Sequence, residues 1–172
     1  MLTPEELTVE VWALKRRVDA CESVLEIQAM KARYAELVDR RFSFGRVVEP
    51  ATLAELAARI ADLFTADGSW DGGPGIGLSV GRQAIARQLS VTTFSFSRHF
   101  FTNPRIVVAG DTAEGKWDIL SPCRRVTGES YWMSGYEDDQ YARVDGVWLH
   151  RSMKLTTVTM TPVSEGWTRI FV

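Results

Sequence analysis

Apolar residues near the N-terminus recur with helical periodicity and follow a clear helix start. Thr3 can cap the helix, Pro4 suits the first helical position, and Glu6 stands at the capping-box position. Apolar residues then follow at alternating spacings of four and three, which is a heptad seam. The seam consists of Leu7, Val11, Leu14, Val18, Cys21 and Leu25. It packs either on its own domain or on a symmetry-related copy of the chain, and the sequence leaves both open.

A second helical pattern covers residues 27–38 and either continues the first helix or restarts near Glu22. Its apolar side carries Ile27, Met30, Tyr34, Leu37 and Val38. Gly45 and Pro50 break the pattern, because glycine and proline are poor inside helices.

Shorter elements follow the break. Thr52 predicts the cap of a third helix over Leu53–Phe64, whose apolar stripe would face the core. Asp67-Gly68 predicts a turn, and residues 69–71 predict a short strand. The glycine-rich residues 72–81 indicate a loop or a wide hairpin, and residues 82–89 a short helix.

Residues after Pro104 change to strand patterns separated by short turns. The predicted strands are 106–108, 113–126, 130–144 and 147–161. Asp145-Gly146 is the strongest hairpin signal in the chain. Strands joined by short turns predict an antiparallel sheet, and helices followed by strands predict the α+β class. We expect residues 1–22 to be an N-terminal helical extension and residues 23–172 to be the single domain.

Composition and charge narrow the class of protein. The chain has 172 residues, of which 45% are apolar and 24% charged, as in soluble globular proteins. A formal net charge of −2 gives no electrostatic footprint for nucleic acid. No apolar run approaches the roughly 20 residues of a membrane span. The 2 cysteines form neither a disulfide framework nor a metal site, so we expect a cytoplasmic protein.

Aromatic residues on the predicted strands indicate an apolar pocket. The chain contains 6 tryptophans, among them Trp70, Trp117 and Trp132, and Tyr136 shares a strand face with Trp132. A curved sheet lined by such side chains and closed by helices would bind a small apolar substrate. The alternative is that these side chains only fill the core.

Candidate chemistry centres on His99. It lies between aromatic residues just before a strand, whereas the other histidine, His150, has the position of a strand-face residue. No spaced set of ligands accompanies either histidine, so no metal site is expected. Asp39 is a candidate to orient the imidazole, and Tyr34 could donate its hydroxyl to a substrate oxygen. Helical counting places Asp39 roughly 140° from Tyr34, which favours a solvated acid, so spacing alone leaves the pairing open.

Five stretches in order resemble the SnoaL-like branch of the nuclear transport factor 2-like superfamily. They are "IQAMKARYAELVDRR", "IADLFTADGSW", "GRQAI", "RHFFTNPRIVVAGDTAEGKW" and "DDQYARVDGVWLHR". The resemblance extends from about Val24 to about Thr161 and implies a cone, in which a strongly bent antiparallel sheet closes with helices over an apolar cavity. The chain looks most like the dehydratase members, which include scytalone dehydratase and bile acid 7α-dehydratase.

The resemblance assigns candidate roles to individual residues. Tyr34, Asp39 and His99 match the catalytic tyrosine, aspartate and histidine of the bile acid enzyme. Ser121 stands where that enzyme has a further acid, and Asp118 is displaced from this position. These matches imply a dehydratase without a cofactor that acts on a small apolar hydroxy-carbonyl compound through a His–Asp base. They also imply a homo-oligomer, either a trimer or a dimer.

Other functions are compatible with the same residues. An isomerase or cyclase would use the same base, and a non-catalytic small-molecule-binding or assembly module would need no base. An epoxide hydrolase of this superfamily would need a carboxylate–arginine–carboxylate set, for which Asp39, Arg98 and Asp118 are the available residues. The apolar tail, with Trp167, Ile170 and Phe171, is expected either to cover the cavity mouth or to pack on a surface.

Overall fold

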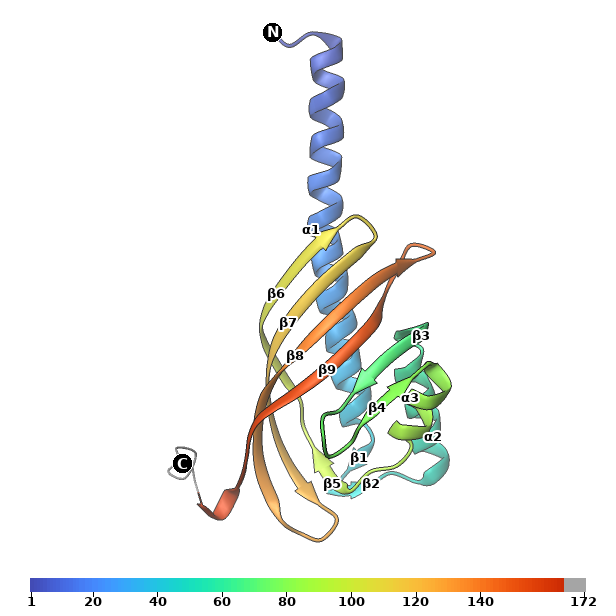
Figure 1. The fold of residues 1–172 in the computed structure, drawn as a ribbon, viewed down its shortest axis with the longest axis vertical. Helices are drawn as coiled ribbons and strands as arrows, with labels where there is room; N and C mark the ends of the chain where they lie inside the picture. The colour runs from blue at the N-terminus through green and yellow to red at the C-terminus, as the bar shows by residue number, and fades with distance from the viewer. Residues whose placement is uncertain (166–172) are drawn as a thin grey trace.

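The protein consists of a long N-terminal helix, two shorter helices and a curved sheet (Figure 1). The structure is a computed structural model that describes residues 1–165, so the apolar tail lies outside the described residues. Helix α1 (Pro4–Asp39) begins with the predicted capping box. The Thr3 hydroxyl accepts a hydrogen bond from the Glu6 backbone N–H at 3.2 Å, and Glu6 accepts one from the Thr3 N–H at 2.7 Å. The helix continues unbroken past Glu22, so the two helical patterns are one element.

Helix α2 (Pro50–Ala61) starts and ends earlier than predicted. Pro50 occupies the start, Glu49 makes no side-chain cap, and Thr52 lies inside the helix rather than capping it. At the other end, Phe64 is the first residue of strand β3 (Phe64–Asp71) and not the last of the helix. The apolar Leu63 and Phe64 fit a helical stripe, but the Leu63 carbonyl accepts a hydrogen bond from the His150 N–H at 2.8 Å.

The predicted helix at residues 82–89 is confirmed as α3 (Arg82–Leu89). The remaining elements are short strands, long strands and one 3₁₀ turn. They are β1 (Phe42–Ser43), β2 (Arg46–Val47), β4 (Leu78–Val80), β5 (Phe94–Ser97), β6 (Phe100–Ala109), β7 (Thr112–Arg125), β8 (Ser130–Val144), β9 (Val147–Pro162) and the 3₁₀ turn η1 (Val163–Glu165).

Two predicted boundaries are wrong because an irregularity sits inside a strand. Asp67-Gly68 lies within β3, where the register with β9 shifts, instead of forming a turn. A Cβ on Gly68 would lie 3.1 Å from the His150 carbonyl oxygen, so the close approach of the strands favours glycine. Strand β6 starts at Phe100 rather than after Pro104, since the register with β7 shifts between Thr102 and Arg105.

The main sheet is mixed, with strand order β4-β3-β9-β8-β7-β5, and β6 also pairs with β7. The hairpins of the C-terminal half are antiparallel as predicted, but β3 pairs with β9 in parallel. This pairing joins strands far apart in the chain, so no tight turn imposes an antiparallel arrangement. The α+β class is confirmed, and the entirely antiparallel sheet is corrected to a mixed one that is not closed.

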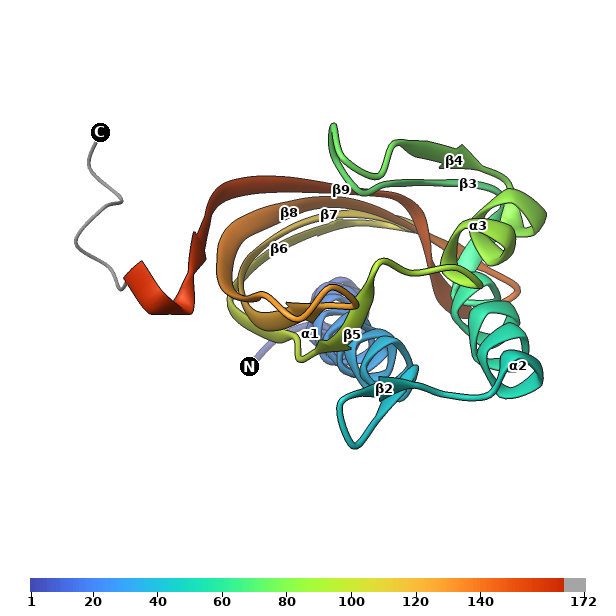
Figure 2. The same cartoon turned by 90° about the horizontal axis from the view of Figure 1, so that it is seen from below.

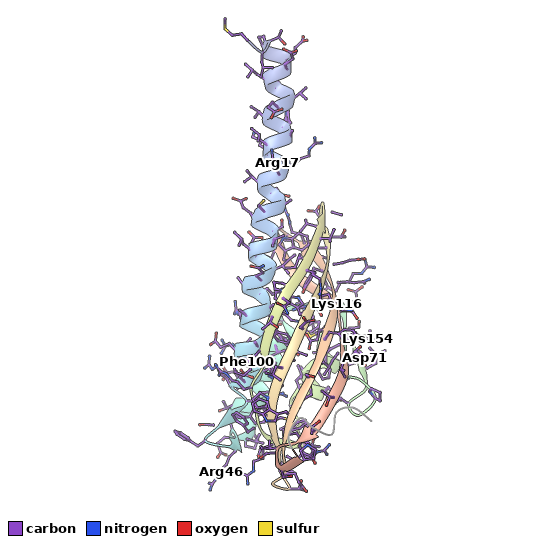
Figure 3. All side chains as sticks on the ribbon, turned by 90° about the vertical axis from the view of Figure 1, so that its left-hand side faces the viewer. Arg17, Arg46, Asp71, Phe100, Lys116 and Lys154 are labelled. Carbon is purple, nitrogen blue, oxygen red and sulfur yellow. The ribbon has the colours of Figure 1, made fainter. Side chains whose placement is uncertain are left out.

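The sheet wraps around the C-terminal half of α1, while α2 and α3 cover one end (Figure 2). Three inward-facing residues of α1 are at most 3% exposed, namely Ile27, Tyr34 and Leu37. The N-terminal half of α1, where Arg17 is labelled, extends beyond the sheet (Figure 3). Within residues 1–165, no helix is long and apolar enough to cross a membrane.

Candidate functional site

Asp39 and His99 meet at the C-terminal end of α1. His99 lies in the short link between β5 and β6, and its Nδ1 is 2.7 Å from Asp39 Oδ1. The His99 backbone N–H also donates to the same carboxylate, at 3.1 Å from Oδ1 and 3.3 Å from Oδ2. The Asp39 side chain is only 7% exposed, so it is not the solvated acid that helical counting favours.

Helical counting fails here because Asp39 is the last residue of α1. At a helix end the neighbouring chain, not the stripe, decides which side chains are covered. The β5–β6 link crosses this end, and Arg98 Nε lies 3.3 Å from Asp39 Oδ2. The carboxylate therefore receives an imidazole, a backbone N–H and a guanidinium, all positioned by one short segment.

The second ring nitrogen of His99 is available for chemistry. Among the residues that the structure describes, none makes a hydrogen bond to His99 Nε2. A carboxylate accepts hydrogen bonds, so the neutral imidazole holds its proton on Nδ1 and leaves the Nε2 lone pair open. The ring is 16% exposed and stacks on Phe101, with ring centroids 6.2 Å apart. An imidazole with a fixed tautomer results.

Ser121 lies across from His99 on the same face of the sheet. The β6–β7 register pairs Phe100 with Leu120, and the Arg98 N–H donates to the Pro122 carbonyl at 3.1 Å. Continuing this register sets Ser121 opposite His99. The Ser121 side chain is buried, so its hydroxyl is a polar group inside the fold, on the side of the sheet that faces His99.

Tyr34 lies deeper, with Phe101 between it and His99. Trp70 Nε1 donates a hydrogen bond to the Tyr34 hydroxyl at 3.1 Å, and both side chains are buried. Burial raises the pKa of the Tyr34 phenol, and the charge of Glu137 adds to the effect. The phenol stays protonated, and its own proton remains free to donate.

The aromatic residues predicted to line one pocket divide between the two faces of the sheet. Trp117 faces inward, where its Nε1 donates to the Tyr141 hydroxyl at 2.8 Å. Trp132 pairs with Pro122 and Tyr136 with Asp118, which places both on the opposite face. The prediction that Trp132 and Tyr136 share a pocket with Trp117 is therefore corrected. Lys116 Nζ lies 3.9 Å from the centroid of the Tyr136 ring on that outer face.

Comparison with known families identifies the chain at the level of a domain family. The SnoaL-like domain model matches residues 19–154, the part of the chain that contains the Asp39–His99 contact. The chain belongs to the SnoaL-like domain family.

Solved structures share the fold of this SnoaL-like domain. The structure of LinA, a hexachlorocyclohexane dehydrochlorinase, is 26% identical with a TM-score of 0.67, covering 84% of this chain and 91% of that one. LinA-type3 from Novosphingobium barchaimii LL02 is 21% identical with a TM-score of 0.68, covering 84% and 92%. A candidate scytalone dehydratase from Novosphingobium aromaticivorans is 23% identical with a TM-score of 0.66, covering 82% and 87%. No curated protein sequence is significantly similar to the chain.

A buried charged cluster, which the sequence predictions missed, contacts the Phe101 ring on which His99 stacks. Lys31 of α1 pairs with Glu137 and, at 2.6 Å, with Asp139, and all three side chains are at most 4% exposed. Lys31 Nζ also lies 4.3 Å from the centroid of the Phe101 ring. Residues Glu137, Asp139 and Tyr141 alternate along β8, which from sequence alone is typical of a solvent-facing strand. The signal was Lys31, which falls on the apolar helical stripe between Ile27 and Tyr34.

His150 has a strand position as predicted, but it is fully buried. Neither of its ring nitrogens has a hydrogen-bond partner among the described residues. Burial lowers its pKa well below the ordinary value, and the charge of Lys31 acts in the same direction. Burial also raises the pKa of the Asp139 carboxyl to about 6, against the opposing effect of Lys31. His150 is thus a neutral interior residue.

A cavity of about 530 Å³ opens away from the Asp39–His99 contact, between α1, α2 and the start of β9. Its lining includes Glu26, Arg33, Arg59, Asp62 and Trp148.

The carboxylate–arginine–carboxylate set of an epoxide hydrolase does not assemble. Arg98 contacts Asp39, but Asp118 lies on the outer face of the sheet, where its Oδ1 is 3.1 Å from Arg105 Nη2. Within the described residues, no group of three or more His, Cys, Asp and Glu side chains could hold a metal ion.

Proposed function

We propose that the protein is a lyase that eliminates water from a small, largely apolar hydroxy-carbonyl compound without a cofactor. The observation that carries this proposal is the 2.7 Å contact between Asp39 and His99 Nδ1, which leaves Nε2 free. A base of fixed tautomer, partly shielded from water, is what proton abstraction next to a carbonyl requires.

The chemical step uses His99 twice. Its Nε2 removes the proton from the carbon next to the carbonyl, and the imidazole becomes a cation that Asp39 stabilises. The electron pair released by that C–H bond forms the new carbon–carbon double bond as the neighbouring C–O bond breaks. The proton on Nε2 then passes to the leaving hydroxyl, which departs as water and restores the neutral base.

Tyr34 and Ser121 supply polar contacts for the substrate in this proposal. The Tyr34 hydroxyl accepts from Trp70 and can donate its own proton to the carbonyl or leaving oxygen, directly or through water, as charge develops. Ser121 lies across from His99 and suits an oxygen near the reacting carbon. Trp70 and Trp117 form apolar walls, whereas Trp132 and Tyr136 on the outer face have no place in the proposed site.

The relatives support an elimination without fixing its leaving group. One is named a dehydrochlorinase and another a candidate dehydratase, and both names denote removal of hydrogen together with a leaving group. Water is our choice of leaving group because the Tyr34–Asp39–His99 set resembles that of dehydratases. An isomerase or cyclase would share the first proton abstraction and differ in the later steps.

The proposal is tested by screening hydroxy-carbonyl compounds for water loss with the native protein and two variants. We expect His99→Gln and Asp39→Asn to lower kcat/KM by about 10²–10⁴-fold, the usual contribution of general-base catalysis. Asp138→Asn, which removes an exposed acid on the outer face of β8, is the matched control for Asp39→Asn and should leave turnover unchanged. Turnover that survives in His99→Gln would contradict the proposal.

A non-catalytic binding module is the second candidate, favoured by the position of the 530 Å³ cavity away from Asp39 and His99. Such a protein would bind compounds of the panel without changing them. Its binding would respond to substitutions at Arg33 or Arg59 and not to His99→Gln, so the same panel distinguishes the two functions.

A further inference from the structure

The N-terminal half of α1 exposes an apolar stripe that the proposed function does not use. Its members, which we call the heptad seam, are Leu7, Val11, Leu14, Val18, Cys21 and Leu25. Each of the large apolar members is at least 44% exposed. Isolated exposed apolar residues are common, but a continuous stripe on a helix that leaves its own domain indicates a partner.

The heptad seam points away from the domain. At about 100° per residue, its mean direction is about 180° from that of the buried residues Met30, Tyr34 and Val38 on the same helix. The domain-facing side of the upper helix is marked by Asp19, which accepts a hydrogen bond from Arg143 at 2.8 Å. A partner on the seam would therefore meet no obstruction from the sheet. The N-terminal half of α1 extends beyond the sheet (Figure 3).

Charges beside the seam identify that partner as a second copy of this chain in parallel orientation. Glu10 and Arg17 occupy g positions, and Lys15 and Glu22 occupy e positions. In a parallel pair in register, Glu10 of one chain lies against Lys15 of the other, and Arg17 lies against Glu22. An antiparallel pair that overlaps the whole seam would instead bring Lys15 against Lys15 and Arg17 against Arg17. Only the parallel arrangement makes every pair attractive.

The residues of the seam itself favour two strands. Val11 and Val18 occupy a positions, and Leu7 and Leu14 occupy d positions. β-Branched residues at a with leucine at d fit the geometry of a two-stranded parallel coiled coil. Because the lower half of α1 is already held by the sheet, the costly nucleation of the helix is complete before the chains meet.

We propose that two copies of this chain associate through the heptad seam as a parallel, in-register coiled coil, with both SnoaL-like domains on its outer sides. The proposal stands independently of the catalytic one, since none of its residues belongs to the candidate site.

Cys21 tests orientation and register without introducing a new group. In the proposed pair, the two Cys21 side chains share one d layer and come within disulfide distance. In the antiparallel pair, Cys21 would lie beside Val11. We expect mild oxidation to produce a reducible species of two chains on a non-reducing gel. Cys123 is buried and is replaced by serine to exclude it.

A matched control separates association from random collision. Cys21→Ala/Arg16→Cys carries its only exposed thiol on the side of the helix away from the seam and should not cross-link. Equal cross-linking of the control, or no cross-linking through Cys21, would overturn the proposal.

Charge substitutions test the pairing by sedimentation of the full chain. Lys15→Glu places two acids opposite each other in the pair, whereas Arg16→Glu changes the charge equally on the outer side of the helix. We expect Lys15→Glu to weaken association by about 10-fold or more, Arg16→Glu to leave it unchanged, and Glu10→Lys to restore it in the Lys15→Glu background. Leu14→Glu should yield single chains.

Three further outcomes would also overturn this inference. A native particle of one or three chains would exclude the two-stranded pair. A dimer that persists in Leu14→Glu would place the interface elsewhere. Binding of the native chain to vesicles containing anionic lipid, without self-association, would assign the seam to a membrane surface instead.

Discussion

At the scale of single residues, Asp39 and His99 show where sequence periodicity stops being informative. Tyr34 falls on the apolar helical stripe, and its burial follows from that pattern. Asp39 lies off the stripe, and only the crossing of the β5–β6 link over the end of α1 covers it. The prediction that Asp39 pairs with His99 rested on the resemblance to known dehydratases and not on the spacing of residues.

Tyr34→Phe tests whether the phenol acts on the substrate. We expect kcat/KM to fall by about 10²-fold or more, because a donor to developing charge is lost, while the fold is retained. The lost hydrogen bond to Trp70 should cost only about 1 kcal/mol of stability. Thermal unfolding monitored beside the elimination assay separates the two effects. Unchanged kcat/KM in a folded Tyr34→Phe variant would leave Tyr34 a packing residue.

At the scale of elements, the buried ion pairs of Lys31 with Glu137 and Asp139 connect α1 to β8. Lys31→Met would leave Glu137 and Asp139 as close, uncompensated carboxylates in the interior. We expect this variant to lose about 3–5 kcal/mol of the free energy of unfolding, measured by denaturant titration. Lys116→Met is the matched control, since the Lys116–Asp138 pair is exposed at 43% and 53%, and it should change stability by less than about 0.5 kcal/mol. Similar losses in the two variants would mean that the cluster does not fasten the helix.

The raised pKa of Asp139 predicts a specific pH dependence of stability. Its carboxyl rises from an ordinary 3.8 to about 6 on folding, so the folded state holds the proton more tightly. The resulting stabilisation is complete below about pH 3.8 and is lost as the pH rises through about 6. The wild type should therefore lose up to about 3 kcal/mol relative to Asp139→Asn between pH 4 and pH 7. Asp138→Asn, on the outer face of the same strand, should show no such trend, and a wild type that instead gains on Asp139→Asn would contradict the shift.

The elements themselves were predictable where local signals agree. The capping box at Thr3, the helix at residues 82–89 and the hairpin at Asp145-Gly146 are all present. The parallel pairing of β3 with β9 was not predictable, because it depends on a contact between distant segments. The alternating Glu137 and Asp139 were also misleading, since buried and exposed polar strand positions have the same period.

At the scale of the whole molecule, self-association should make the thermal transition depend on concentration. If folded chains pair through the heptad seam, mass action raises Tm as protein concentration rises. We expect this dependence in the native chain and its absence in Leu14→Glu, both followed by circular dichroism over about a 100-fold range of concentration. A Tm independent of concentration in both proteins would count against the pair, and an equal dependence in both would place it on another surface.

In the proposed reaction, His99 removes a proton next to a substrate carbonyl. The most direct measurement monitors hydroxy-carbonyl compounds by NMR in D2O, recording both deuterium incorporation beside the carbonyl and formation of the double bond. We expect the native protein to accelerate both signals or the second alone, and His99→Gln to lower the rate by at least about 100-fold. Equal rates with native protein and His99→Gln would contradict the assignment of His99 as the base.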